Sequence, residues 1–141
     1  MSQIIEDALT SKLAAWIADH LPDAIPSAVP VWVANRDEVR TRPCIVLDAP
    51  ESKRVPAPPD TSRIKLEVHL FTQIDDTPAD DHAAFAKALA AMLADKGAIK
   101  TGLNTDSFVL YALMLRESVT SPDEARGRES ILTYEAVVSA V

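Results

Sequence analysis

Hydrophobic and polar residues alternate strictly between Arg63 and Leu70, and this alternation predicts a β-strand. Successive side chains of a strand point to opposite faces, so one face would be apolar and the other charged. The apolar face would carry Ile64, Leu66, Val68 and Leu70, and the polar face Arg63, Lys65, Glu67 and His69. One packed and one solvated face is typical of an antiparallel sheet. The charged face therefore either meets solvent or lines a hydrophilic contact, such as a pore or a subunit interface.

Two other segments place apolar residues at helical spacing. Residues 3–20 predict an amphipathic helix that ends before Pro22, because proline disfavours helical geometry in the residue preceding it. An alanine-rich segment from Pro78 to about Lys96 predicts a second helix with one apolar face.

Shorter apolar runs and turn residues complete the predicted elements. Strands are expected at 29–33, 44–47, 63–73, 108–115 and 130–141. Residues 48–62 contain four prolines and residues 118–129 are charged, so both are predicted to be long loops that are mobile in the free subunit. This order predicts a single α+β domain over residues 1–141, a mostly antiparallel sheet of about five strands with two main helices packed on one face.

Composition narrows the class of protein. A chain of 141 residues with 48% hydrophobic residues is long enough to bury a core as one domain, and no uncharged apolar run reaches the 18 residues of a membrane span. The N-terminus has no apolar signal segment, so we expect the protein to be made and kept in the cytoplasm of its producing cell. Its net charge is −7, and the cations of residues 36–65 are interleaved with acids, which argues against a compact duplex DNA site. An acidic protein can still surround DNA without gripping it.

The densest group of potential metal ligands comprises Asp75, Asp76, Asp80, Asp81 and His82. Carboxylates and an imidazole can hold a divalent ion, but this spacing lacks the alternating ligands and glycine of an EF-hand. The same residues suit a helix start, with Thr77 as N-cap, Pro78 at the first helical position and acids in the first turn. We therefore favour helix capping over a metal site.

Other reactive side chains have simpler structural explanations. No serine, threonine or cysteine lies in a nucleophile motif, so His69 and His82 are expected to be solvated rather than general bases. Cys44, the single cysteine, is expected to be buried and inert. Trp16 and Trp32 are expected to pack in the core rather than to anchor an interface. Three glycines exclude a phosphate-binding or dinucleotide loop. We expect no catalytic residue, no cofactor and no metal.

The strand from Ile64 to Thr72, followed by an acidic, proline-started turn and the helix from His82 to Leu93, resembles a known pattern. It is similar to the tail-terminator or tail-completion proteins of tailed bacteriophages and prophages, and the order of elements matches over nearly the whole chain. The resemblance implies a structural virion protein rather than an enzyme. Such a protein is made in the bacterial cytoplasm and located in the tail, where it forms a ring that caps the tail tube, ends tail polymerisation and provides the attachment surface for the head or neck.

The resemblance also implies a set of partners. They are further copies of the chain in a ring, with a hexamer as one size to consider, the tail tube protein, the head-tail connector or neck protein, and DNA passing through the lumen without sequence-specific binding; no membrane is expected. Candidate interface residues are the charged residues of the strand face and the predicted loops: Lys53, Arg54, Arg63, Lys65, Glu67, Asp123, Glu124, Arg126 and Arg128.

Two alternatives remain open from the sequence. One is a small cytosolic protein-binding module with the proline-rich segment as its ligand arm. The other is a small metal-dependent enzyme that uses the acidic cluster from Asp75 to His82.

Overall fold

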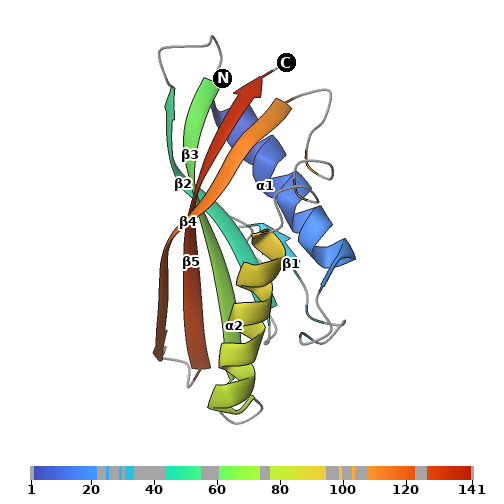
Figure 1. The fold of residues 1–141 in the computed structure, drawn as a ribbon, viewed down its shortest axis with the longest axis vertical. Coiled ribbons are helices and arrows are strands. Elements are labelled where there is room, and N and C mark those ends of the chain that lie inside the picture. The colour runs from blue at the N-terminus through green and yellow to red at the C-terminus, as the bar shows by residue number, and fades with distance from the viewer. Residues whose placement is uncertain are drawn as a thin grey trace.

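The computed structural model describes residues 2–21, 25, 29, 31–33, 44–54, 61–73, 77–94, 99, 103, 108–122 and 127–140. Two long helices and five strands cover most of them (Figure 1). In chain order these are α1 (Ser2–Asp19), β1 (Val31–Val33), β2 (Cys44–Arg54), β3 (Thr61–Gln73), α2 (Ala79–Leu93), β4 (Phe108–Pro122) and β5 (Gly127–Ala140). The α+β class predicted from the sequence is confirmed.

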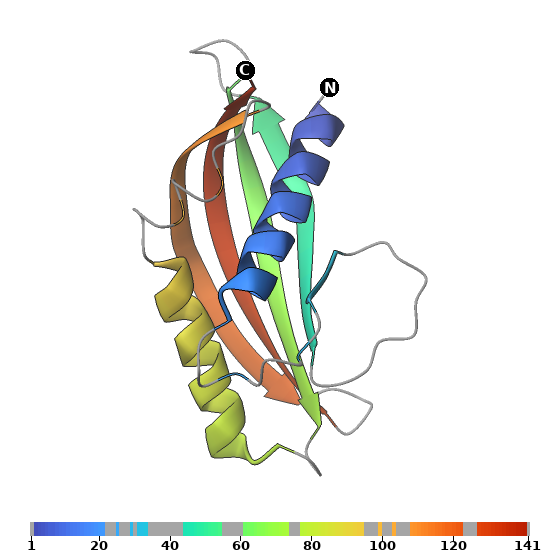
Figure 2. The same cartoon turned by 90° about the vertical axis from the view of Figure 1, so that its right-hand side faces the viewer.

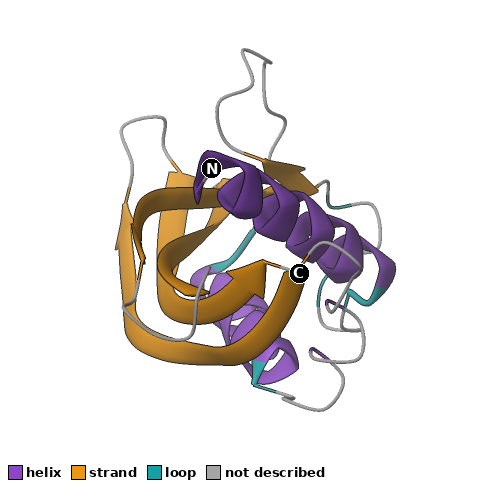
Figure 3. Ribbon diagram, turned by 90° about the horizontal axis from the view of Figure 1, so that it is seen from above, coloured by secondary structure: helices purple, strands orange, loops and turns teal. Residues whose placement is uncertain are grey.

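The strands form one sheet in the order β1-β2-β3-β5-β4. The four long strands pair antiparallel, whereas the short edge strand β1 runs parallel to β2. The last strand of the chain is therefore inserted between β3 and β4, and β4 forms the other edge. Seen from above, the sheet is strongly curved around the helices (Figure 3).

Both helices lie on the same face of the sheet, as predicted (Figure 2). Burial along β3 alternates residue by residue, with Ile64, Leu66, Val68 and Leu70 in the core. Leu9, Leu13 and Ile17 of α1, and Leu89 and Leu93 of α2, complete the same hydrophobic cluster. Each such buried aliphatic side chain contributes about 1.5–3 kcal/mol relative to an exposed one. We call the other surface of the sheet, opposite the helices, the outer face.

The prediction of long loops at 48–62 and 118–129 is wrong for most of these residues. β2 continues to Arg54, β3 begins at Thr61, β4 continues to Pro122 and β5 begins at Gly127. Polar side chains are compatible with these strands because one sheet face is solvated. Pro50 lies where the register shifts between Asp48 and Glu51, and such a bulge accommodates a residue without a backbone N–H. Residues 55–60 and 123–126 lie outside the described residues.

The predicted Thr77 cap is also corrected. α2 begins at Ala79 with Pro78 as N-cap, and no side chain caps the helix. Thr77 is instead buried. Its backbone N–H donates to the Gln73 carbonyl (2.8 Å), and its own carbonyl accepts a bond from the Arg128 guanidinium (2.7 Å). The backbone of residue 77 thus ties the start of α2 to the Gln73 carbonyl of β3 and to the Arg128 side chain of β5. These two bonds need no particular side chain at position 77.

Candidate functional site

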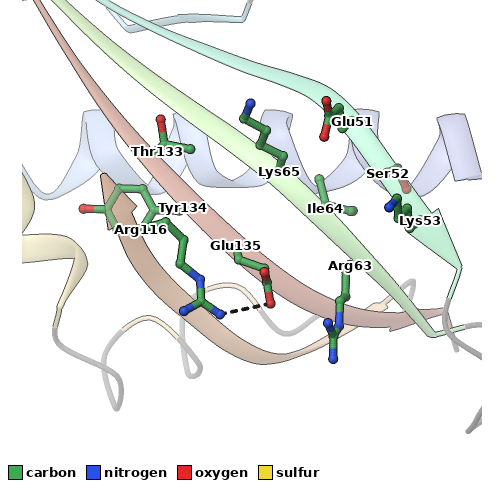
Figure 4. Close-up of a pocket in the computed structure, with 10 residues that line it drawn as sticks. All are labelled: Glu51, Ser52, Lys53, Arg63, Ile64, Lys65, Arg116, Thr133, Tyr134 and Glu135. Atoms are coloured by element: carbon green, nitrogen blue, oxygen red, sulfur yellow. Dashed lines mark hydrogen bonds and ion pairs between the residues drawn. The ribbon is translucent and has the colours of Figure 1, made fainter. Parts of the chain in front are cut away.

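Charged side chains cross the outer face in a row with alternating signs. Directly paired residues of antiparallel strands share a face, and Lys65 of β3 pairs with both Glu51 of β2 and Glu135 of β5. Arg116 of the edge strand β4 extends the row, because its guanidinium lies 3.4 Å from a Glu135 carboxylate oxygen (Figure 4). The row therefore reads acidic, basic, acidic, basic across four strands.

The neighbouring row begins with two cations. Lys53 of β2 is the register partner of Arg63 of β3, and both side chains are exposed. Among the described residues, neither has an ion-pair partner. Like charges directly opposite each other destabilise a sheet, so this pair is a local cost to the isolated subunit.

These two rows line a groove of about 350 Å³ on the outer face, with the helices behind the sheet (Figure 4). Its charged lining comprises Lys53, Arg63, Lys65, Arg116, Glu51 and Glu135. Cations outnumber carboxylates by two, although the whole chain has a net charge of −7. The groove is therefore suited to bind anionic groups, such as the carboxylates of another protein surface. We call this set of residues the basic groove.

A histidine between two carboxylates lies further along the outer face. His69 Nδ1 is 2.7 Å from Glu129 and Nε2 is 3.2 Å from Glu67. The His69 side chain is only 18% exposed and stacks on Phe71, so its expected solvation is partly wrong. The position beside Glu67 on the polar face is as predicted. Both ring nitrogens are engaged, which gives His69 a structural part in cross-strand pairing.

His82 contradicts the expectation of a solvated side chain more fully. It is buried, and its Nδ1 and Nε2 lie 2.7 and 2.8 Å from the hydroxyl oxygens of Thr72 and Ser130. The Ser130 hydroxyl in turn lies 2.6 Å from that of Thr120. Burial lowers the pKa of His82 below its usual 6.5, and the nearby Arg128 guanidinium lowers it further. The sequence did hold a signal, because His82, Leu89 and Leu93 share one helical face.

The acidic cluster is not brought together with this histidine. Asp80 and Asp81 are exposed in the first turn of α2, whereas His82 faces the core. Asp75 and Asp76 lie outside the described residues. Within the part of the chain that the structure describes, no three histidine, cysteine or acidic side chains are placed to hold a metal ion.

The edge strand β4 exposes apolar side chains that the sequence analysis missed. Tyr111, Leu115 and Val119 are each about half exposed, and they are the large exposed hydrophobic residues among those described. Leu115 pairs with buried Tyr134 and so lies on the helix side, whereas Val119 pairs with Ile131 on the outer face. An edge strand also has a sheet neighbour on one side only, so its other side can pair with a further strand. A partner that covers this edge would reach apolar side chains on both faces.

The predicted interface residues divide into three groups. Lys53, Arg63 and Lys65 line the basic groove, and Glu67 lies beside it, 4.0 Å from Lys65. Arg128 is bonded to Thr77 and pairs with Thr72 on the helix side, which gives it a part in holding the fold. The side chain of Arg54 lies outside the described residues, as do Asp123, Glu124 and Arg126. Three charged residues of the groove were not predicted from the sequence: Arg116, Glu51 and Glu135.

The remaining predicted core residues agree with the structure where it describes them. Cys44 is buried, and Trp16 packs in the core and stacks on His20. The side chain of Trp32 is outside the described part. Among the described helices, none is long and apolar enough to cross a membrane.

Comparison with known proteins gives a likeness in fold to a solved structure, without a match in sequence. No protein-family model matches the chain, and no curated protein sequence matches it. Among solved structures, the chain is similar to a chain of the structure described as "Virion of native gene transfer agent (GTA) particle". The TM-score is 0.66 at 15% sequence identity, and the match covers 91% of this chain and 93% of the other. The two chains therefore share one fold over nearly their whole lengths.

Proposed function

We propose that this chain is a structural virion protein of a phage-like tail, a subunit of the ring that caps the tail tube. The observation that carries the proposal is the likeness to a chain of a gene transfer agent virion, which covers more than nine tenths of both chains. The proposed role is architectural rather than enzymatic.

The surfaces of the subunit support a role in assembly. A closed ring needs two different surfaces on each subunit, because every head-to-tail contact joins one surface to the other. The basic groove on the outer face and the apolar edge of β4 are both candidates for contact with a neighbouring subunit or with the tube protein. The ring would end tail polymerisation by covering the last turn of tube subunits. Its other side would receive the connector or neck protein.

The net charge suits a ring through which DNA passes. Like charge between an acidic lumen and the phosphate backbone limits adhesion, so DNA would move through without being held. The proposed partners are thus other copies of the chain, the tube protein and the connector, with DNA passing through the lumen without sequence-specific binding. The proposed location is the tail of the virion.

Deletion of the gene in the producing strain tests this role. We expect tailless heads together with free tails of irregular or excessive length, and restoration of complete particles when the gene is supplied on a plasmid. Mass spectrometry of purified complete particles should also detect the protein. Tails of normal length that are joined to heads in the deletion strain would contradict the proposal.

A further inference from the structure

The basic groove holds cations that the subunit itself does not neutralise. Lys53 and Arg63 face each other across β2 and β3, with no ion-pair partner in the described part of the chain. A like-charged pair of this kind destabilises the sheet until an anion lies beside it. The groove as a whole has an excess of two positive charges. An anionic partner would offset the repulsion between Lys53 and Arg63 and neutralise the excess positive charge.

The same subunit exposes an anionic surface of matching charge. Asp80 and Asp81, which we call the acidic turn, lie in the first turn of α2, and both side chains are exposed. Within the described residues, neither is in an ion pair. Two adjacent carboxylates would neutralise the excess charge of the groove.

The two surfaces lie at opposite ends and on opposite faces of the sheet (Figures 1 and 2). Arg63 is near the start of β3, and the acidic turn follows its end, where the Thr77 N–H is bonded to the Gln73 carbonyl. At about 3.3 Å per residue, the strand between Arg63 and Gln73 spans roughly 33 Å. A contact between the groove of one subunit and the acidic turn of another therefore joins two different surfaces, which is a head-to-tail arrangement.

We propose that the basic groove of one subunit receives the acidic turn of a second copy, and that this contact joins neighbours in the ring. The inference rests on the proposed ring and names the two surfaces that meet in it. DNA is the competing anion. The groove favours a compact protein partner, because two carboxylates match Lys53 and Arg63, the two groove cations that are unpaired among the described residues. An extended phosphate backbone would also run beside Glu51 and Glu135, which would repel it.

A complementary charge reversal tests the contact. Variant A carries Lys53→Glu and Arg63→Glu, so its groove and its acidic turn are both acidic. Variant B carries Asp80→Lys and Asp81→Lys, so both of its surfaces are basic. Each variant alone should lose self-association, weakened by about tenfold or more, because like charges then meet. An equimolar mixture should recover it, since every groove then finds a turn of opposite charge in an alternating assembly.

Sedimentation velocity at low salt measures the association, alone and with the tube protein present. Lys12→Glu with Lys87→Glu, and Asp7→Lys with Asp19→Lys, are matched controls that change charge equally at exposed positions of α1 and α2 and should behave as wild type. Circular dichroism confirms that each variant is folded. Wild-type association should disappear near 1 M salt, where the screening length falls to about 3 Å.

Carbodiimide cross-linking reads the contact directly. In a mixture of ¹⁵N-labelled and unlabelled wild-type protein, we expect heavy–light cross-links from Lys53 or Lys65 to Asp80 or Asp81. The proposal is overturned if these cross-links are absent, if the mixture of variants associates no better than either alone, or if the groove instead binds duplex DNA in a manner that variant A abolishes. If the charge reversals have no effect but the protein is still found at the end of the tail, only this contact is ruled out. If the protein is absent from particles, the proposed function itself is ruled out.

Discussion

At the scale of single residues, the buried histidine is the clearest departure from what the sequence indicated. The residues next to His82 in the sequence do not show whether its side chain is exposed or buried. Its two hydrogen-bond partners, Thr72 and Ser130, lie outside the helix, in strands β3 and β5. Only the shared helical face with Leu89 and Leu93 pointed inward. The network links α2 to β3 and β5, and through Thr120 to β4.

His82 should make the fold sensitive to mild acid. Because its pKa is lower in the folded state, the unfolded chain binds the proton more readily below about pH 6.5. The contribution of His82 to stability is therefore complete above pH 6.5 and is lost as the pH falls through the lowered pKa. We expect urea unfolding between pH 5 and 8 to show this slope in the wild type and less of it in His82→Gln.

The exposed His20 provides the matched control for that measurement. His20→Gln should leave the wild-type slope intact. At pH 8, His82→Gln should cost about 1–3 kcal/mol, because buried hydroxyl groups lose a well-placed partner. Parallel stability curves for the wild type and His82→Gln would refute the assignment.

At the scale of elements, local pattern predicted β3 and both helices, because alternation and helical spacing are properties of a segment by itself. Local pattern did not predict the segments whose strand structure depends on pairing with a neighbouring strand. The proline-rich and charged stretches read as loops, yet Lys53 and Arg54 pair with Arg63 and Ser62, and β4 continues to Pro122 beside β5. The groove was predicted in part, through Lys53, Arg63 and Lys65, but its acidic members came from strands whose register the sequence does not specify.

The apolar edge of β4 should contribute to assembly more than to folding. Leu115→Lys and Val119→Lys place charge at side chains that are 48% and 46% exposed, so we expect stability to change by less than about 0.5 kcal/mol. Association with other copies or with the tube protein should weaken, because an edge strand with a charged surface resists pairing. Sedimentation velocity across a range of concentrations measures this.

Ala15→Lys adds the same charge to an exposed position of α1, outside the basic groove, the acidic turn and the β4 edge, and serves as control. If the control weakens association as much as the β4 variants do, the effect is one of net charge. If the β4 variants assemble as the wild type does, the edge has no part in the interface.

At the scale of the whole molecule, the fold class followed from the sequence because burial on one face of a long sheet requires covering helices. Assembly did not follow, since it depends on how surfaces from distant strands come together. The isolated subunit has a like-charged pair in its groove and an uncovered apolar edge, both of which a neighbour would relieve. Exposed ion pairs contribute only about 0–1 kcal/mol each, so a ring built on the groove alone should be weak and form most readily on the tube.

Cryo-electron microscopy of intact particles from the producing strain would show whether the chain forms a ring at the end of the tail. We expect a closed ring of this chain, in a single layer, between the last turn of the tail tube and the neck. Each subunit should contact two neighbours through different surfaces. A chain that is absent from the particle, or that repeats along the tube or in the head shell, would contradict this expectation.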